Sequence, residues 1–258
     1  MPAVNLSQAL RDEYQILFDT CEIKTEKLSS IESIITKIVN NQNRYEIAAN
    51  SLGIPWFFIA AIHNMESSLN FNCHLHNGDP LSARTTHVPS GRPITGNPPF
   101  SWEESAEDSL TFQKLDKWSD WSLSGLLYKI EAYNGWGYRN NHPEVLSPYL
   151  WSGSNHYTSG KYVADGRWSD TATSNQIGAA VILRRLSEKK LISFEDEQIP
   201  KKPFVHYSSK RIEYGEQLQK FLNQFPGVRV LVDGVPGQKT SDAFKLVTGN
   251  YLQGDPRA

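Results

Sequence analysis

The sequence lacks several features that would place it in a specialised class of protein. It contains two cysteines, Cys21 and Cys73, which excludes a disulfide scaffold and predicts two free thiols. No apolar run approaches the roughly eighteen residues that a membrane span needs. The longest run, from Ile54 to Ile62, is far shorter. We therefore expect no membrane insertion.

An excess of charge of one sign is also missing. The chain has 26 Lys and Arg residues against 28 Asp and Glu residues, a formal net charge of −2. Proteins that bind nucleic acids or anionic membranes carry clusters of basic residues, so neither partner is expected. The N-terminal segment MPAVNLSQALRDEYQ lacks the basic region and apolar core of a secretory signal. A role outside the cell would therefore require a trimmed chain or another export route.

The length of the chain, 258 residues, suits one large and one small domain. Residues 195–208 are charged, contain prolines and show no periodicity, so they are predicted to form a linker. The predicted domains are then residues 1–194 and 209–258. A monomer is expected.

Helical periodicity dominates the first domain, which predicts a mainly α fold. Ser29 and Glu32 form a capping-box pattern ahead of a helix that extends to about Gly53. The segment from Pro55 to about Leu69 is apolar on nearly every side, which is typical of a helix buried within a domain. Further helices are predicted at 102–115, where Ser101 and Glu104 form a second capping box, and at 123–133 and 173–186.

Turn-forming sequences fill residues 74–99. They include Asn77-Gly78-Asp79-Pro80 and two further clusters of Gly and Pro, at 90–93 and 96–99. The stretches between these turns leave room for a short β-hairpin, which is predicted here.

Glu66 is the leading candidate for a catalytic group. It lies near the end of the buried helix, on the same face as Ile59, Ile62 and His63. Burial disfavours the ionised form of a carboxyl group and raises its pKa, as a general acid at neutral pH requires. Considered without its context, a Glu on a last helical turn is more often an ordinary surface residue.

Asp79 is the candidate for a second catalytic group. It lies thirteen residues after Glu66, within a turn. Across a cleft it could act as nucleophile, as the base for a water molecule or as an electrostatic stabiliser. An Asp in such a turn also commonly binds its own backbone, so both interpretations stay open. Thr85 and Thr86 are alternative residues for positioning a water molecule.

No metal or cofactor is expected. His74 and His76, with His63 and Asp79 not far away in the sequence, match no compact zinc-binding spacing. No Gly-rich phosphate-binding loop is present either.

Two motifs resemble those of a known superfamily. IPWFFIAAIHNMESSLNF resembles the catalytic segment of the lysozyme-like superfamily, in particular lytic transglycosylases and wall hydrolases of bacteria and phages. IEAYNGWGYR resembles the Tyr-Asn-Gly motif of lytic transglycosylases. The resemblance implies a lysozyme-like α+β catalytic domain with Glu66 as general acid, Tyr133 as the residue that orients it, and Asn134 and Gly135 at the sugar site.

The same resemblance supplies the rest of the predicted substrate site. HNGDPLSARTTHVPSGRP and SPYLWSGSNHYTSGKYVADG resemble loops of such wall hydrolases, and the predicted contacts to the sugar polymer are Ser67, Thr85, Thr86, Arg92 and Tyr138. The residues after Glu66-Ser67 depart from the common Glu-Ser-x-Phe pattern.

The C-terminal segment GEQLQKFLNQFPGVRVLVDGVPGQKTSDAFKLV resembles a peptidoglycan-binding module of three short helices. Leu218-Gln219, Val232-Asp233-Gly234, Gly237 and Thr240 match its motif in order and spacing. Pro236 departs from it, because an aromatic residue is usual at that position.

Together the resemblances imply an enzyme that acts on the cell wall and cleaves the β-1,4 glycan strand of peptidoglycan or a related amino-sugar polymer. A muramidase and a lytic transglycosylase both fit, and the role of Asp79 would separate them. Two alternatives stay open: a glycoside hydrolase of the chitinase or chitosanase type, and a wall-binding protein without activity.

Overall fold

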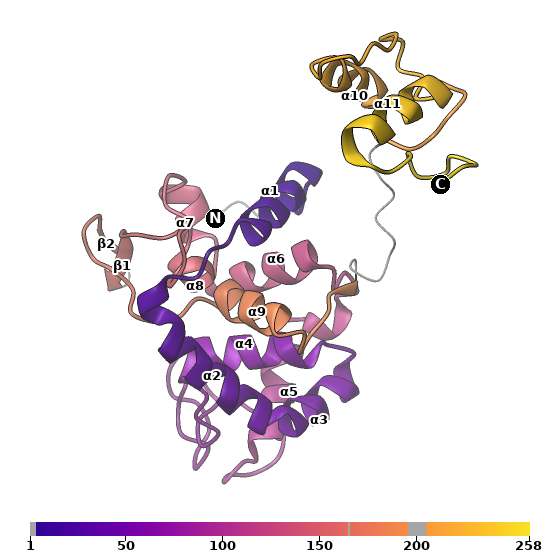
Figure 1. Cartoon of the computed structure of the whole chain (residues 1–258). Coiled ribbons are helices and arrows are strands. Elements are labelled where there is room, and N and C mark those ends of the chain that lie inside the picture. Colours follow the sequence, from indigo (N-terminus) through magenta and orange to yellow (C-terminus); the bar gives the residue numbers. More distant parts are fainter. Residues whose placement is uncertain (1–3, 165, 196–204) are drawn as a thin grey trace. The chain divides into compact units, whose positions relative to one another are not determined.

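The computed structural model describes residues 4–164, 166–195 and 205–258, and the chain divides into two units, Met1–Gln198 and Ile199–Ala258 (Figure 1). The boundary lies within the predicted linker, most of which is outside the described residues. Tyr207 and Ser208, predicted as linker, donate backbone hydrogen bonds to the carbonyls of Gln253 and Pro236. They therefore belong to the C-terminal unit.

The N-terminal unit is mainly helical, as predicted. Its helices are α1 (Gln8–Asp19), α2 (Leu28–Asn40), α3 (Gln42–Leu52), α4 (Trp56–Ser67), α5 (Trp102–Phe112), α6 (Leu123–Asn134), α7 (Gly137–Asn141), α8 (Pro148–Trp151) and α9 (Ala179–Glu188), with 3-10 turns at Thr25–Lys27 and Leu115–Lys117.

Helix α4 is the central helix of this unit. Every residue from Phe57 to Met65 is buried, and the helix packs against α3, α6 and α9 (Figure 1). Gly53, with a φ of 66°, ends α3, and Pro55 immediately precedes the first residue of α4. The predicted buried helix is therefore confirmed, and it brings Glu66 to the edge of the core.

One predicted capping box is wrong and the other is confirmed. Helix α2 begins at Leu28 without a side-chain cap, so Ser29 does not cap it. Glu32 pairs instead with Arg185 and Lys189, at 2.5 and 2.9 Å. The predicted single helix up to Gly53 is in fact two, α2 and α3. At α5, Ser101 and Glu104 form the reciprocal bonds of a capping box.

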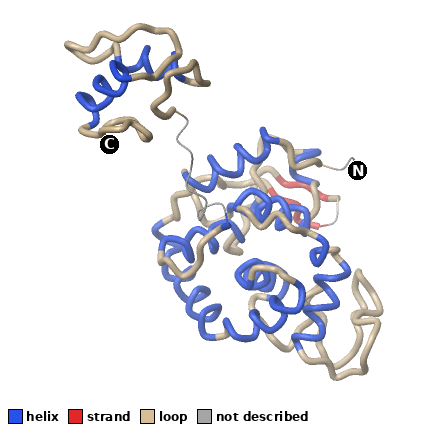
Figure 2. The backbone as a smooth tube through the Cα atoms, turned by 90° about the vertical axis from the view of Figure 1, so that its right-hand side faces the viewer, coloured by secondary structure: helices blue, strands red, loops and turns tan. Residues whose placement is uncertain are grey.

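The β-hairpin lies elsewhere than predicted. Strands β1 (Lys161–Ala164) and β2 (Arg167–Ser169) form a two-stranded antiparallel sheet (Figure 2). In its register Tyr162 lies opposite Trp168. Residues 74–99 contain no strand; an isolated bridge joins Cys73 to Pro80. The prolines of this segment lack the N–H groups that a ladder requires, which accounts for the error.

A buried charged cluster joins α1 to α6 and α7. The hydroxyl of Tyr14 donates to Glu131 at 2.5 Å. Arg139 donates from Nε to the same carboxylate oxygen at 2.9 Å and from a terminal nitrogen to Glu13 at 3.0 Å. The side chain of Glu131 is only 4% exposed. Removal of one partner of the buried Glu131–Arg139 ion pair would cost about 3–5 kcal/mol, and α1 is joined to this pair through the Tyr14 hydroxyl and Glu13.

No single helix among the described residues has the length and apolar character to cross a membrane. Only α3 and α4 taken together reach that threshold, and the pair is bent by 115°.

The described part of the C-terminal unit contains two helices, α10 (Gly215–Leu222) and α11 (Gln238–Thr248), rather than the predicted three. Its core is small, with Leu222, Val228 and Ala243 at its centre. The buried amide of Gln219 accepts hydrogen bonds from the N–H groups of Asp233 and Gly234 at 2.9 and 2.8 Å. The motif residues Gln219, Asp233 and Gly234 therefore hold the loop between the two helices.

We expect Gln219→Leu to destabilise the C-terminal unit by about 1–3 kcal/mol, because it leaves the buried N–H group of Gly234 and the part-buried one of Asp233 without their acceptor. Scanning calorimetry of the full chain should show a lower transition temperature for this unit and an unchanged one for the N-terminal unit. Gln217→Leu, at an exposed position of the same helix, is the control. Equal effects of the two substitutions would contradict the role of Gln219.

Candidate active site

The carboxyl group of Glu66 lies at the end of α4, where the buried helix reaches the surface of the unit. Its Oε1 accepts a hydrogen bond of 2.7 Å from the hydroxyl of Tyr149, in α8. Burial raises the pKa of Glu66 to about 7, and the bond from Tyr149 opposes part of this rise. At neutral pH this carboxyl group is therefore present in both the acid and the ionised form.

Tyr133, which the resemblance implies as the residue that orients Glu66, makes no hydrogen bond to it. Its hydroxyl donates to the carbonyl of Leu75 at 3.2 Å and shares a hydrogen bond of 2.9 Å with Ser109. Tyr133 nevertheless lies close enough for the charge of Glu66, together with burial, to raise its pKa. The partner of Glu66 is Tyr149, which sequence reasoning missed.

A pocket lies beside Tyr149, the hydrogen-bond partner of Glu66, although Glu66 itself does not line it. Its wall is formed by Asn134, Tyr138, Pro148, Tyr149, Lys161, Ser174 and Gln176. Two residues of the predicted sugar site, Asn134 and Tyr138, are thus placed together beside the partner of Glu66. Gly135 ends α6 with a φ of 85°. Lys161 and Gln176 were not predicted.

Gln176 fixes the end of α4. Its amide nitrogen donates to the carbonyls of Met65 and Asn64 at 2.7 and 3.3 Å. The last carbonyls of a helix have no partner within the helix, so this side chain supplies one just before Glu66. Ser67, predicted as a substrate contact, bonds its own helix at the carbonyl of His63, at 3.4 Å.

Asp79 organises its own loop. Its Oδ2 accepts from the backbone N–H groups of Thr86 and His87 at 2.7 and 3.0 Å, and its Oδ1 accepts from Nδ1 of His87 at 2.6 Å. Burial alone would raise the pKa of Asp79, but these hydrogen bonds outweigh it and hold that pKa well below the usual range. Asp79 makes no contribution to the shift of Glu66, which arises from burial and Tyr149.

The loop that Asp79 anchors lies against the end of α4. Gly78 has a φ of 79°, and a Cβ atom at this position would come within 3.1 Å of the backbone carbonyl oxygen of Glu66. A side chain there would be strained by the backbone conformation and crowded by the helix end. The glycine thus permits the close approach of the loop to the residue that carries the carboxyl group.

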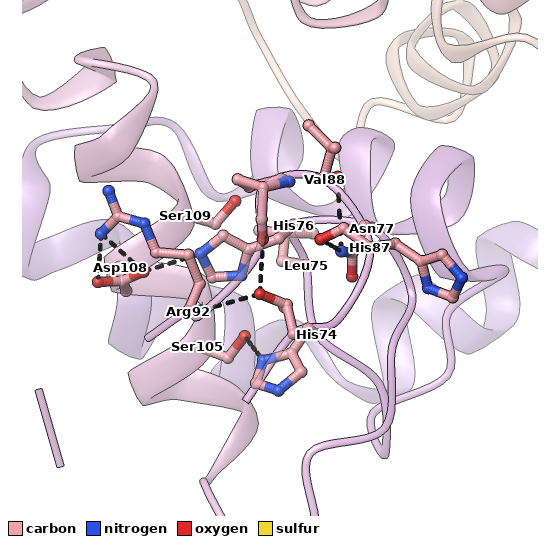
Figure 3. A network of polar contacts seen from close by, with 12 residues as sticks. His74, Leu75, His76, Asn77, His87, Val88, Arg92, Ser105, Asp108 and Ser109 are labelled. Carbon is pink, nitrogen blue, oxygen red and sulfur yellow. Dashed lines mark hydrogen bonds and ion pairs between the residues drawn. The ribbon is translucent and has the colours of Figure 1, made fainter. Parts of the chain in front are cut away.

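Three predicted substrate contacts have roles within this loop network. Thr85 is buried and donates from its hydroxyl to the carbonyl of Pro89 at 2.5 Å, while Thr86 bonds Asp79. Arg92 pairs with Asp108 of α5 at 3.1 Å (Figure 3). The structure therefore assigns these side chains to the support of the loop, and none of the three lines the pocket beside Tyr149.

Each histidine of this region forms hydrogen bonds with a different partner. His74 bonds Ser105 and the carbonyl of Ala83, at 2.7 and 2.8 Å, and His76 bonds Asp108 at 2.8 Å (Figure 3). His63 bonds Tyr45 at 3.0 Å, and burial lowers the pKa of His63 to about 4. Within the described residues no group of three or more His, Cys, Asp or Glu side chains is placed to hold a metal ion. Both cysteines are free thiols.

No protein-family model, curated protein or solved structure matches the chain.

We expect Asp79→Asn to destabilise the N-terminal unit by about 1–3 kcal/mol at pH 7, because an amide cannot accept all the hydrogen bonds that reach the carboxylate. A lowered folded-state pKa stabilises the fold above the unfolded pKa of about 4. The difference from wild type should therefore shrink as the pH falls below about 4. Urea unfolding at pH 7 and pH 3 measures it, with the exposed Asp19→Asn as control. Equal stability at pH 7 would contradict the anchoring role.

We expect Tyr149→Phe to raise the pKa of Glu66 further, by roughly one unit, because it removes a hydrogen bond that favours the ionised form. Carbon-13 NMR titration of glutamate-labelled protein measures the shift, with the Glu66→Gln spectrum assigning the signal. Tyr133→Phe is the matched control, since the Tyr133 hydroxyl bonds Leu75 and Ser109 instead. A pKa of Glu66 that is unchanged by Tyr149→Phe would refute the electrostatic role of Tyr149.

Proposed function

We propose that this chain cleaves the β-1,4 glycan strand of peptidoglycan, with Glu66 as the general acid. One observation carries the proposal. Glu66 is a carboxyl group with a pKa of about 7, hydrogen-bonded to a tyrosine in the wall of a polar pocket. A general acid works best when its pKa lies near the working pH, and an ordinary glutamate is far from that range.

In the proposed reaction Glu66 protonates the glycosidic oxygen between N-acetylmuramic acid and N-acetylglucosamine. The bond from that oxygen to the sugar C1 breaks, and C1 becomes an oxocarbenium-like centre. Glu66 is left as a carboxylate, which the Tyr149 hydroxyl stabilises through its 2.7 Å hydrogen bond. The protonated fraction of Glu66 falls as the pH rises through about 7, which sets the alkaline limit of the reaction.

The surroundings of Glu66 favour a lytic transglycosylase over a muramidase. Both carboxylate oxygens of Asp79 already accept hydrogen bonds from its loop, and the hydroxyl of Thr85 is engaged by the same loop. With Asp79 engaged by its loop, the C6 hydroxyl of the muramic acid can attack C1. Glu66 then accepts the hydroxyl proton, and the product is a 1,6-anhydro sugar. Hydrolysis by a water molecule is the second candidate.

The features of the C-terminal unit favour a polymer as the substrate of this chain. The hydrogen bonds of Gln219 give a physical reason for the Leu-Gln and Val-Asp-Gly motifs by which this unit resembles wall-binding modules. Beside them lies a pocket whose wall includes Asp233, Lys239 and Leu231, the last with 76% of its surface exposed. We propose that this unit holds the chain on the cell wall.

We expect Glu66→Gln to lower the release of soluble fragments from purified sacculi at least about a hundredfold, because an amide cannot donate the proton. Mass spectrometry of the fragments identifies the reaction: anhydro-muropeptides indicate a transglycosylase, and reducing-end muropeptides a muramidase. Glu26→Gln, at an exposed glutamate, is the control and should act like wild type.

Other results would contradict the proposal in different ways. Full activity of Glu66→Gln would remove Glu66 from the mechanism. Binding of sacculi by the wild-type chain without any release would favour a wall-binding protein without activity. Release from chitin or chitosan oligomers alone would favour a chitinase or chitosanase.

A further inference from the structure

A second pocket lies on the other side of Gln176. Its wall includes Lys37 and three serines of α2, together with Asn64 of α4; the serines are Ser29, Ser30 and Ser33. We call it the α2–α4 groove. Gln176 lines both this groove and the pocket beside Tyr149, and Asn64 lies only two residues before Glu66. The groove therefore borders the end of α4 that carries the proposed general acid.

The groove contains an amide oxygen that is free to accept a hydrogen bond. Asn64 is only 5% exposed, and its amide nitrogen contacts the sulfur of Met65 at 3.8 Å, a weak acceptor. In the part of the chain that the structure describes, its Oδ1 accepts no hydrogen bond. Because this oxygen is not among the buried atoms without a partner, solvent can reach it. A ligand in the groove that donates an N–H group can therefore bond this oxygen.

Lys37 supplies the charge of the groove. Its side chain is exposed, makes no ion pair within the described residues, and is the one charged residue in the wall of the groove. By contrast, the positive charges of Arg185 and Lys189 are both paired with the carboxylate of Glu32, which also belongs to α2. A free ammonium group in a groove without carboxylates attracts an anion.

We propose that the α2–α4 groove binds the carboxylate-bearing substituent of the muramic acid, with Lys37 pairing the carboxylate and Asn64 accepting an amide N–H. This inference rests on the proposed function and specifies its substrate. Two sources carry this chemistry on the strand: the free lactyl carboxylate where no stem is attached, and the carboxylates of the peptide stem where the lactyl carboxyl group is joined to the stem as an amide. The groove would thus distinguish peptidoglycan from uncharged amino-sugar polymers while Glu66 performs the same reaction.

The test measures binding by the full chain carrying Glu66→Gln, so that no probe is consumed. The probes are a disaccharide-repeat oligomer with peptide stems, the same oligomer without stems, and a chitin oligomer of equal length. We expect Lys37→Met to raise Kd about three- to tenfold for a carboxylate-bearing probe and to leave the chitin oligomer unchanged. Lys37→Arg should retain binding, and added salt should reduce the difference. Lys190→Met, an exposed lysine outside the groove, is the control.

The results distinguish the two sources of the carboxylate, and they distinguish failure of the groove proposal from failure of the proposed function. Loss of affinity for the stem-free probe alone assigns the free lactyl carboxylate, loss for the stem-bearing probe alone assigns the carboxylates of the stem, and loss for both shows that the groove accepts either carboxylate. Equal loss for all three probes, or for none, overturns the groove proposal. If wild-type chain releases fragments from sacculi in that case, the proposed function stands without the groove. If it releases nothing, the proposed function fails and the groove proposal fails with it.

Discussion

The free energy cost of ionising a carboxyl group at the edge of the core governs the chemistry of the N-terminal unit. Helix α4 is buried along nearly its whole length, and Glu66 lies where it emerges. The C-terminal end of a helix carries partial negative charge, which disfavours the ionised form of a nearby carboxyl group. Burial has the same effect, so both raise the pKa of Glu66. Tyr149 offsets part of that cost with one hydrogen bond. The packing of α3, α6 and α9 around α4 thus creates the acidity as well as the fold.

Two carboxyl groups of this region illustrate how surroundings decide function. Burial dominates at Glu66 and raises its pKa, whereas donated hydrogen bonds dominate at Asp79 and lower its pKa. The sequence predicted the surroundings of Glu66, because an apolar helix is a local pattern. It left the role of Asp79 open, because the bonds from Thr86 and His87 depend on how the loop folds. Tyr149 was missed for a related reason: it lies 83 residues from Glu66 in a short helix without periodicity.

The fold was predictable where a local pattern decided it. The α4 helix, its boundaries at Gly53 and Pro55, and the capping box at Ser101 each depend on residues within a few positions of one another. The predictions failed where a distant partner decided the outcome. Glu32 was expected to cap its own helix, yet it pairs with residues of α9. The hairpin expected among the turns of 74–99 is found instead between strands 161–164 and 167–169. These strands contain no proline, so every residue has a backbone N–H group to donate.

The cluster of Tyr14, Glu131 and Arg139 has a consequence for the evolution of the chain. Helix α1 exposes Ile16 to solvent, and its buried face includes Tyr14. Its loss would leave the buried carboxylate of Glu131 without the hydroxyl that donates to it, on the same helix that bears Tyr133 and Asn134. A shorter ancestor or descendant that lacked α1 would therefore need a compensating change at position 131 or 139. We expect the three positions to vary together among related chains.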